Sequence, residues 1–157
     1  MARNTSMSSH QWDTAIDQEI SPLFLNLQWA QAKSIDVIRP LMAKYQVSLA
    51  EFDVLATLRN APSPHELTPT QIQNEVVITS GGLTKILLQL ERRGLVKRLI
   101  QKDDLRIKPV TLTTQGKTLI EVAMVDVMKT TSQWIRVRLD QEQMKQLTVL
   151  LRQLVNK

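Results

Sequence analysis

The sequence has no cysteine, only two histidines and only four glycines. Without cysteine it can form no disulfide, thiolate nucleophile or cysteine-based metal site. His10 and His65 are too few for a histidine-rich metal site, and the glycines follow no phosphate-binding pattern. Because general acid–base, nucleophilic and metal-assisted catalysis need such groups, we expect neither an enzyme nor a bound cofactor.

Long hydrophobic runs are also missing. No apolar stretch approaches the roughly 20 residues that a membrane span needs, and residues 1–10 are polar, without the apolar centre of a signal peptide. We therefore expect a cytoplasmic protein with no membrane partner. The 157 residues, 43% of them hydrophobic, suit one compact unit with a substantial core.

Positive charge is concentrated in the middle of the chain, whose formal net charge is +5. Between Thr79 and Lys108 there are eight basic residues and three acidic ones, whereas the rest of the sequence holds 12 of each. The whole excess of positive charge therefore lies on this one segment. A local cationic patch of this kind is typical of a nucleic-acid-binding surface.

Capping patterns mark the starts of several helices. In each pattern a Ser, Thr or Asp precedes a Glu or Gln by three residues, so that each side chain can accept from a free backbone N–H of the other. The pairs are Ser48 with Glu51, Thr68 with Gln71, and Asp140 with Gln143. They predict helices over 49–59 and 69–76 and a last helix from 141.

Three further helices complete this pattern. The first is expected from Ser21 to about Tyr45, with a bend near Arg39 because Pro40 removes a backbone hydrogen bond. Another begins at Thr79 or Ser80 and ends at Gly94, and a long one, capped by Thr113, extends to about 138.

Two strands are expected between these helices, over 95–100 and 107–112, joined by a polar turn at 101–106. Pro109 indicates that the second is an edge strand or a short one, because proline cannot donate a hydrogen bond. The stretch 60–67 contains two prolines and is expected to be a loop, with His65 as a solvated loop residue.

Two short helices followed by a hairpin with a basic tip are the parts of a winged helix-turn-helix, with a DNA-reading surface between Thr68 and Thr111. The second helix needs one buried face, which Leu83, Ile86, Leu87 and Leu90 supply. Thr84, Lys85, Gln89 and Arg92 lie largely opposite. Ser80, Gly81 and Gly82 would let the helix start approach DNA closely, although paired glycines can also merely loosen a helix start.

The segment from Leu67 to Thr113 resembles the MarR family of bacterial transcriptional regulators. The resemblance lies in the helix opening SGGLT, the exit LERRGLV into the first strand, and the entry LTTQG into the next helix. Upstream, SLAEFDVLATL is similar to the second helix of that family. Residues 49–116 are covered in this way, whereas the two ends are similar only in the order of their helices.

The resemblance implies roles for particular residues. Ser80, Gly81, Thr84 and Lys85 match positions that face the major groove, and Lys85 is the first choice for reading a guanine. Thr70 and Gln71 match a helix start near the DNA backbone, and Arg98 is assigned to a phosphate. For Arg92, Arg93 and Lys97, a solvated surface and a contact with DNA remain equally open.

The wing departs from the family, which usually has Asp-Arg-Arg where this chain has Asp104, Leu105 and Arg106. The resemblance implies that Arg106 enters the minor groove and that Asp104 orients it. With the middle arginine missing, Lys102 and Lys108 are candidates for the phosphate contacts.

The terminal helices carry apolar stripes that a small winged helix cannot cover, so a twofold homodimer is expected. It would place two recognition helices about 34 Å apart on a pseudo-palindromic operator in double-stranded DNA. We expect dimerisation helices over 1–47 and 113–157, around a DNA-binding domain over 48–112. The resemblance implies the same arrangement.

Many members of the family bind small aromatic acids or phenolic compounds in a cleft beside the dimerisation helices. Binding there would release DNA by favouring a different spacing of the recognition helices. Candidate lining residues, with Arg39 pairing a carboxylate, are Trp12, Trp29, Arg39, Met124 and Met128. Core or dimer packing is the alternative role for the apolar ones, and a regulator that needs no ligand is the alternative function.

Overall fold

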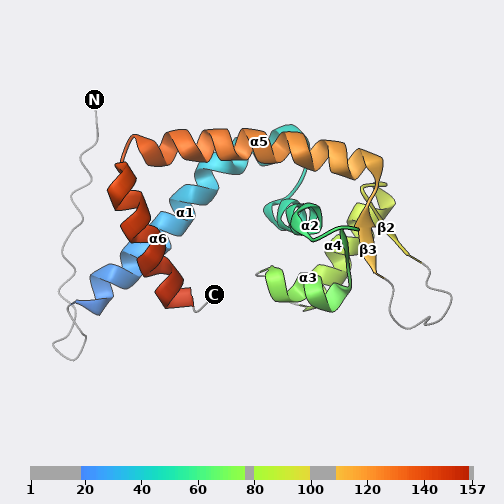
Figure 1. Ribbon diagram of the computed structural model, residues 1–157, viewed down its shortest axis with the longest axis horizontal. Coiled ribbons are helices and arrows are strands. Elements are labelled where there is room, and N and C mark those ends of the chain that lie inside the picture. The colour runs from blue at the N-terminus through green and yellow to red at the C-terminus, as the bar shows by residue number, and fades with distance from the viewer. Residues whose placement is uncertain (1–18, 77–79, 100–108, 156–157) are drawn as a thin grey trace. The chain divides into compact units, whose positions relative to one another are not determined.

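The computed structural model describes residues 19–76, 80–99 and 109–155. Over these residues the chain forms mainly helices, with three short strands near its middle (Figure 1). The elements in chain order are α1 (Ile20–Tyr45), α2 (Leu49–Asn60), β1 (Glu66–Leu67), α3 (Pro69–Glu75), α4 (Ser80–Arg92), β2 (Val96–Arg98), β3 (Val110–Leu112), α5 (Thr114–Arg136) and α6 (Gln141–Val155). The expected fold class, mainly α-helical with a small β-wing, is confirmed.

The chain divides into two compact units, residues 1–35 and 36–157, and the boundary falls inside α1. In the first unit, α1 exposes several large apolar side chains, namely Ile20, Leu23, Phe24 and Trp29. The helix continues past Pro40 without ending, so this proline does not split it.

The predicted capping boxes are present at the helix starts. Ser48 Oγ accepts a hydrogen bond from the Glu51 N–H at 3.2 Å, and Glu51 Oε2 accepts one from the Ser48 N–H at 2.8 Å. The same reciprocal pair begins two further helices, α3 with Thr68 and Gln71, and α6 with Asp140 and Gln143. These bonds satisfy backbone donors that a helix start leaves without partners.

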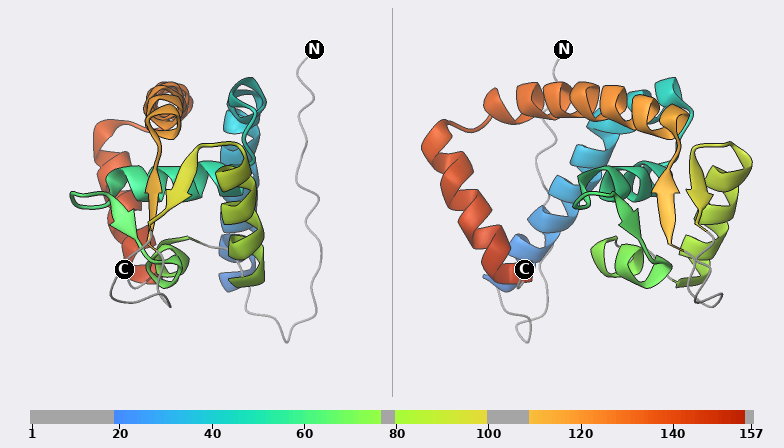
Figure 2. Two further views of the ribbon diagram at one scale, coloured as in Figure 1. Left: turned by 90° about the vertical axis from the view of Figure 1, so that its right-hand side faces the viewer. Right: turned by 45° about the vertical axis from the view of Figure 1, so that its right-hand side comes forward.

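The core of the second unit is built around α2. Val54, Leu55 and Leu58 are completely buried, and α2 packs between α5 and the pair formed by α3 and α4 (Figures 1 and 2). Buried apolar side chains of four further elements join the same cluster: Ile72 from α3, Leu83, Leu87 and Leu90 from α4, Val110 from β3, and Ile120 and Ala123 from α5. One core therefore holds both short helices and the sheet.

The three strands form an antiparallel sheet in the order β1-β3-β2. The expectation of a loop over 60–67 missed β1, since a strand of two residues carries no periodic signal; it pairs Glu66 with Thr111. Of the two alternatives expected after Pro109, an edge strand or a short one, the structure has a short strand of three residues, β3, which lies at the centre of the sheet. Its shortness was predicted correctly. Pro109 precedes β3 and needs only its carbonyl, which accepts a hydrogen bond from the Leu99 N–H at 2.8 Å.

His65 also differs from its expected role as a solvated loop residue. Its side chain is half-buried, and its Nδ1 lies 2.6 Å from the Ala61 carbonyl oxygen. Its backbone has a φ of 62°, and its own carbonyl accepts a hydrogen bond from the Thr111 hydroxyl at 3.1 Å. His65 therefore ties the loop to both α2 and β3.

The junction between α4, β2 and α5 is centred on the backbone of Leu95. Its N–H donates to the Leu90 carbonyl at 2.9 Å, closing the end of α4, where Gly94 takes a φ of 68°. Its carbonyl accepts from the Thr113 N–H at 3.0 Å. Gly116, in the first turn of α5, lies so close that an added Cβ would be 1.9 Å from that carbonyl oxygen.

Ion pairs connect α5 to α2 and to the end of α1. Arg59 Nε on α2 lies 2.6 Å from Glu121 Oε1. Nearby, Asp126 Oδ2 accepts from both Lys44 Nζ and the Tyr45 hydroxyl, each at 2.6 Å. Both hydrogen bonds stabilise the charged carboxylate, so the pKa of Asp126 is lowered, while the same carboxylate raises the pKa of Lys44.

Within the ranges that the structure describes, no helix is both long enough and apolar enough to cross a bilayer. The same ranges contain no group of three or more histidine or acidic side chains placed to hold a metal ion.

Replacing Gly116 by alanine should destabilise the protein, because the new methyl group would collide with the rigid Leu95 backbone. We expect the free energy of unfolding to fall by roughly 2 kcal/mol or more, measured by urea denaturation. Gly81→Ala is the matched control, since nothing lies within 4 Å of an added Cβ there. Equal effects of the two substitutions would contradict this account of the junction.

Candidate DNA interface

The helix-turn-helix consists of α3 and α4, and the short connection between them lies outside the described residues. At the start of α3, Thr70 and Gln71 are both exposed. Gln71 has a structural role that the sequence-based assignment to the DNA backbone left out: its Oε1 accepts from the Thr68 N–H at 2.8 Å. Thr70 is therefore the simpler candidate for an outside contact.

The recognition helix α4 has one buried and one bare side, as predicted. Leu83, Leu87 and Leu90 have exposed fractions of 3%, 2% and 0%. On the other side, Gly81, Thr84 and Lys85 are exposed. Ser80 begins the helix, and nothing lies within 4 Å of the place where a Cβ on Gly81 would sit. The start of α4 is thus open to close approach by a large partner.

The structure distinguishes the three basic residues, Arg92, Arg93 and Lys97, for which the sequence allowed either a solvated surface or a contact with DNA. Arg93 has a structural role: its Nη1 lies 2.9 Å from Glu51 Oε1, and its Nη2 donates to the Gln46 carbonyl at 2.8 Å. Arg92 and Lys97 are exposed and remain candidates for contact with DNA.

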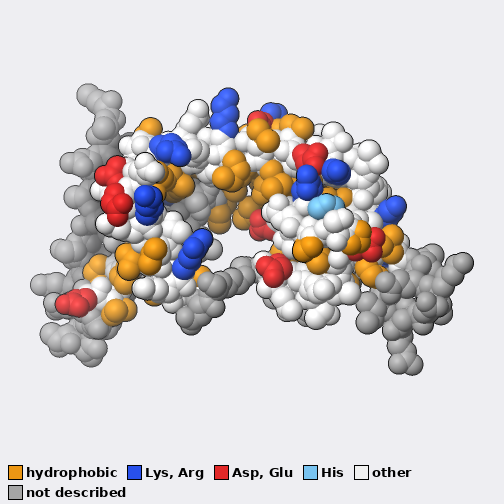
Figure 3. Space-filling view, in the orientation of Figure 1, with side chains coloured by type: hydrophobic (Ala, Val, Ile, Leu, Met, Phe, Trp, Pro, Cys, Tyr) orange, Lys and Arg blue, Asp and Glu red, His pale blue; other side chains and the backbone are white. Residues whose placement is uncertain are grey.

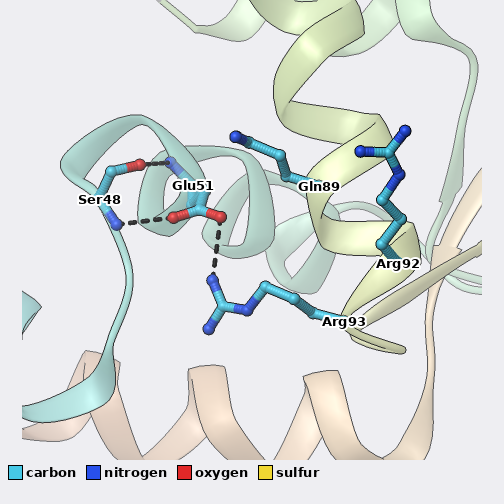
Figure 4. Close-up of a pocket in the computed structure, with 5 residues that line it drawn as sticks. All are labelled: Ser48, Glu51, Gln89, Arg92 and Arg93. Carbon is cyan, nitrogen blue, oxygen red and sulfur yellow. Dashed lines mark hydrogen bonds and ion pairs between the residues drawn. The ribbon is translucent and has the colours of Figure 1, made fainter.

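A shallow hollow of about 430 Å³ lies between the start of α2 and the end of α4, lined by Ser48, Glu51, Gln89, Arg92 and Arg93. Figure 4 shows Arg93 reaching across to Glu51 and Gln89 extending from α4 towards the start of α2. Glu51 is almost fully buried. The carboxylate of Glu51 therefore belongs both to the capping box of α2 and to the ion pair with Arg93 that links α2 to the end of α4.

Arg98 lies at the end of β2 and is half-buried, with its Nε 3.4 Å from Glu91 Oε2 on α4. A long, partly exposed pair of this kind is weak and easily replaced by another anion. The predicted wing residues Lys102, Asp104, Arg106 and Lys108 lie outside the described residues.

The residues expected to bind a ligand are placed as follows. Trp12 lies outside the described residues, and Trp29 is exposed on α1 in the first unit. Arg39, in the second unit, is paired with Asp36 at 2.8 Å on its own helix. On α5, Met124 packs against the core, whereas Met128 is exposed. The structure thus gives Met124 the packing role that the sequence had left as an alternative.

We expect Arg93→Ala to destabilise the protein by about 1 kcal/mol, because the nearly buried Glu51 would lose its cation. Arg92→Ala, the adjacent exposed arginine, is the control and should change the free energy of unfolding little. Urea denaturation of both variants distinguishes them. If Arg92→Ala lowered the free energy of unfolding more than Arg93→Ala, the proposed stabilising role of the Arg93–Glu51 pair would be wrong.

The MarR family model matches residues 47–108, which include α2, α3, α4 and β2. The transcriptional regulator PecS of Dickeya dadantii is 39% identical over 80 residues, 51% of this chain and 48% of PecS. The chain thus spans about half the length of that relative in the match. PecS is a transcriptional regulator, which agrees with the expectation that this chain, lacking the usual catalytic groups, is not an enzyme.

Solved structures extend the likeness to most of the chain. A structure of a mutant MarR from E. coli complexed with operator DNA is 26% identical, with a TM-score of 0.77, and the match covers 88% of this chain and 99% of MarR. NadR in complex with 4-hydroxyphenylacetate is 27% identical, with a TM-score of 0.68, covering 83% of this chain and 89% of NadR. The helix-turn-helix geometry, the match of the MarR family model to residues 47–108 and these likenesses together show that the chain contains a winged helix-turn-helix domain similar to that of MarR transcriptional regulators.

Proposed function

We propose that this protein is a homodimeric repressor in the cytoplasm that binds a pseudo-palindromic DNA operator through α4 and the wing. A small aromatic acid or phenolic ligand would release it. The observation that carries the proposal is α4 itself, in which Leu83, Leu87 and Leu90 are buried in the core. On the other side of the helix, Gly81, Thr84 and Lys85 are exposed. The similarity to MarR bound to operator DNA supports the same use of the fold.

The division of roles follows from position. Residues at the start of a recognition helix meet base edges, so Ser80, Gly81, Thr84 and Lys85 are proposed to read sequence. Arg98 is proposed to bind a phosphate, which would replace Glu91 as its partner. Thr70 and Gln71, with Lys102, Asp104, Arg106 and Lys108 of the wing, complete the proposed interface.

The dimer is proposed to form through the terminal helices. None of the residues that the structure describes in α6 is buried, although its leucines recur every three or four residues and so form one apolar stripe. Leu147, Leu150 and Leu154 are all exposed, and hydrophobic side chains reach the surface over α6 (Figure 3). A second copy that buried this stripe would remove apolar surface from water and set the spacing of two recognition helices.

Footprinting on the DNA upstream of the protein's own gene would test the function directly. We expect one protected site with two half-sites about one helical turn apart. If no sequence were protected there, and none were enriched from a random DNA library, specific operator binding would be excluded.

Lys85→Ala and Arg98→Ala should weaken DNA binding in different ways. Lys85→Ala should relax base preference in one position of each half-site, since lysine is suited to reading guanine. Arg98→Ala should weaken all DNA alike and lower the salt dependence by about one counterion per subunit. Binding titrations at several salt concentrations measure both effects, with Lys145→Ala on α6 as a charge-matched control. Equal losses on specific and non-specific DNA for both variants would contradict the division of roles.

A panel of small aromatic acids, including 4-hydroxyphenylacetate, tests the ligand. A binder present at about 100 times its Kd should raise Tm by roughly 5–10 °C and release operator DNA. Arg39→Gln should abolish both effects if Arg39 pairs with a carboxylate, whereas Arg138→Gln, two residues beyond the end of α5, should preserve them. If no member of the panel stabilises the protein or releases DNA, the ligand-independent regulator is favoured.

A further inference from the structure

Leu88 is an exposed leucine near the middle of the recognition helix, with 43% of its surface exposed. Successive residues of an α-helix are separated by about 100°. The side of α4 opposite Leu83, Leu87 and Leu90 therefore carries Gly81, Lys85, Leu88 and Arg92. Leu88 lies on this bare side, and the residues three and four positions from it along the helix are all polar or charged, namely Thr84, Lys85, Glu91 and Arg92.

The chemistry of the DNA major groove gives such a leucine a role. The base edges there present hydrogen-bond donors and acceptors, together with one apolar group, the C5-methyl of thymine. Lys85 and Thr84 precede Leu88 by three and four residues, so their side chains lie beside it on the helix surface. If Lys85 reaches a base edge, Leu88 lies over a neighbouring base pair.

A protein partner fits this position less well. The exposed apolar residues of α5 and α6 occur in groups, whereas Leu88 lies between the exposed cations Lys85 and Arg92. A protein surface that covered Leu88 would also remove water from both cations, which is costly without anionic partners. DNA supplies phosphates for the two cations and an apolar methyl group for the leucine.

We infer that Leu88 is a specificity-determining residue that contacts a thymine methyl group in each half-site of the operator. This inference rests on the proposed function and adds to it a base preference that the polar residues of α4 do not provide. It makes at least one A·T pair of each half-site a determinant of affinity, at a position next to the pair read by Lys85.

The test replaces each thymine of the selected operator in turn by deoxyuridine, which removes only the methyl group. Affinities are measured for the wild type, Leu88→Ala and Gln89→Ala, with thermal denaturation to confirm that all three are folded. Gln89 is the matched control because it is the next residue, is exposed, and extends towards α2 (Figure 4).

We expect deoxyuridine at the contacted thymine of one half-site to weaken wild-type binding by about fourfold, the value of one buried methyl group. Gln89→Ala should keep this loss, and Leu88→Ala should bind the unmodified operator more weakly and show no further loss. Unchanged affinity of the wild type for every substituted operator, or an undiminished loss in Leu88→Ala, would overturn the role of Leu88 while leaving operator binding intact. If the wild type selects no operator, the proposed function fails as well.

Discussion

The backbone of Leu95 is the point on which the arrangement of the DNA-binding elements depends. The N–H of Leu95 donates a hydrogen bond that closes the end of α4, and Leu95 directly precedes β2. Its carbonyl accepts hydrogen bonds from Thr113, the residue that caps the start of α5. Gly116 allows α5 to approach this backbone more closely than any other residue type would permit. Because packed interiors transmit displacement instead of absorbing it, a shift of α5 would move the end of the recognition helix and the base of the wing together.

The basic residues around this junction divide between anchoring and contact. Arg93, Arg59 and Lys44 are each paired with a carboxylate on another element, so they hold α4, α5 and the end of α1 in place around α2. Lys85, Arg92 and Lys97 are exposed and form no ion pair with another described residue. Arg98 is intermediate, since its pair with Glu91 is long. Within the positively charged segment 79–108, Arg93 therefore holds the fold together, whereas Lys85, Arg92 and Lys97 are the cations that the proposed DNA contact would use.

The apolar side chains also fall into two groups, one buried in the core and one exposed on the surface. The second unit buries one side of α4 and part of α5, yet leaves Val122, Val125 and Met128 of α5 and the leucines of α6 exposed. Proteins rarely leave such groups of apolar side chains in water, which is the physical basis for the proposed dimer. Leu88 differs from them because it stands alone among polar and charged neighbours.

The sequence by itself determined the order of the helices, because the signals for them are local. Examples are the capping pair of Ser48 with Glu51 and the leucine stripe of α4, which depend only on residues close together in the chain. It also located the bare side of α4 and its basic residues. Only the tertiary structure decided that β3 is central, that His65 joins α2 to β3, and that Arg93 is a clamp while Arg92 is not. Those outcomes depend on contacts between residues far apart in the chain, such as Arg93 with Glu51 and Gly116 with Leu95, and no local pattern specifies such pairs.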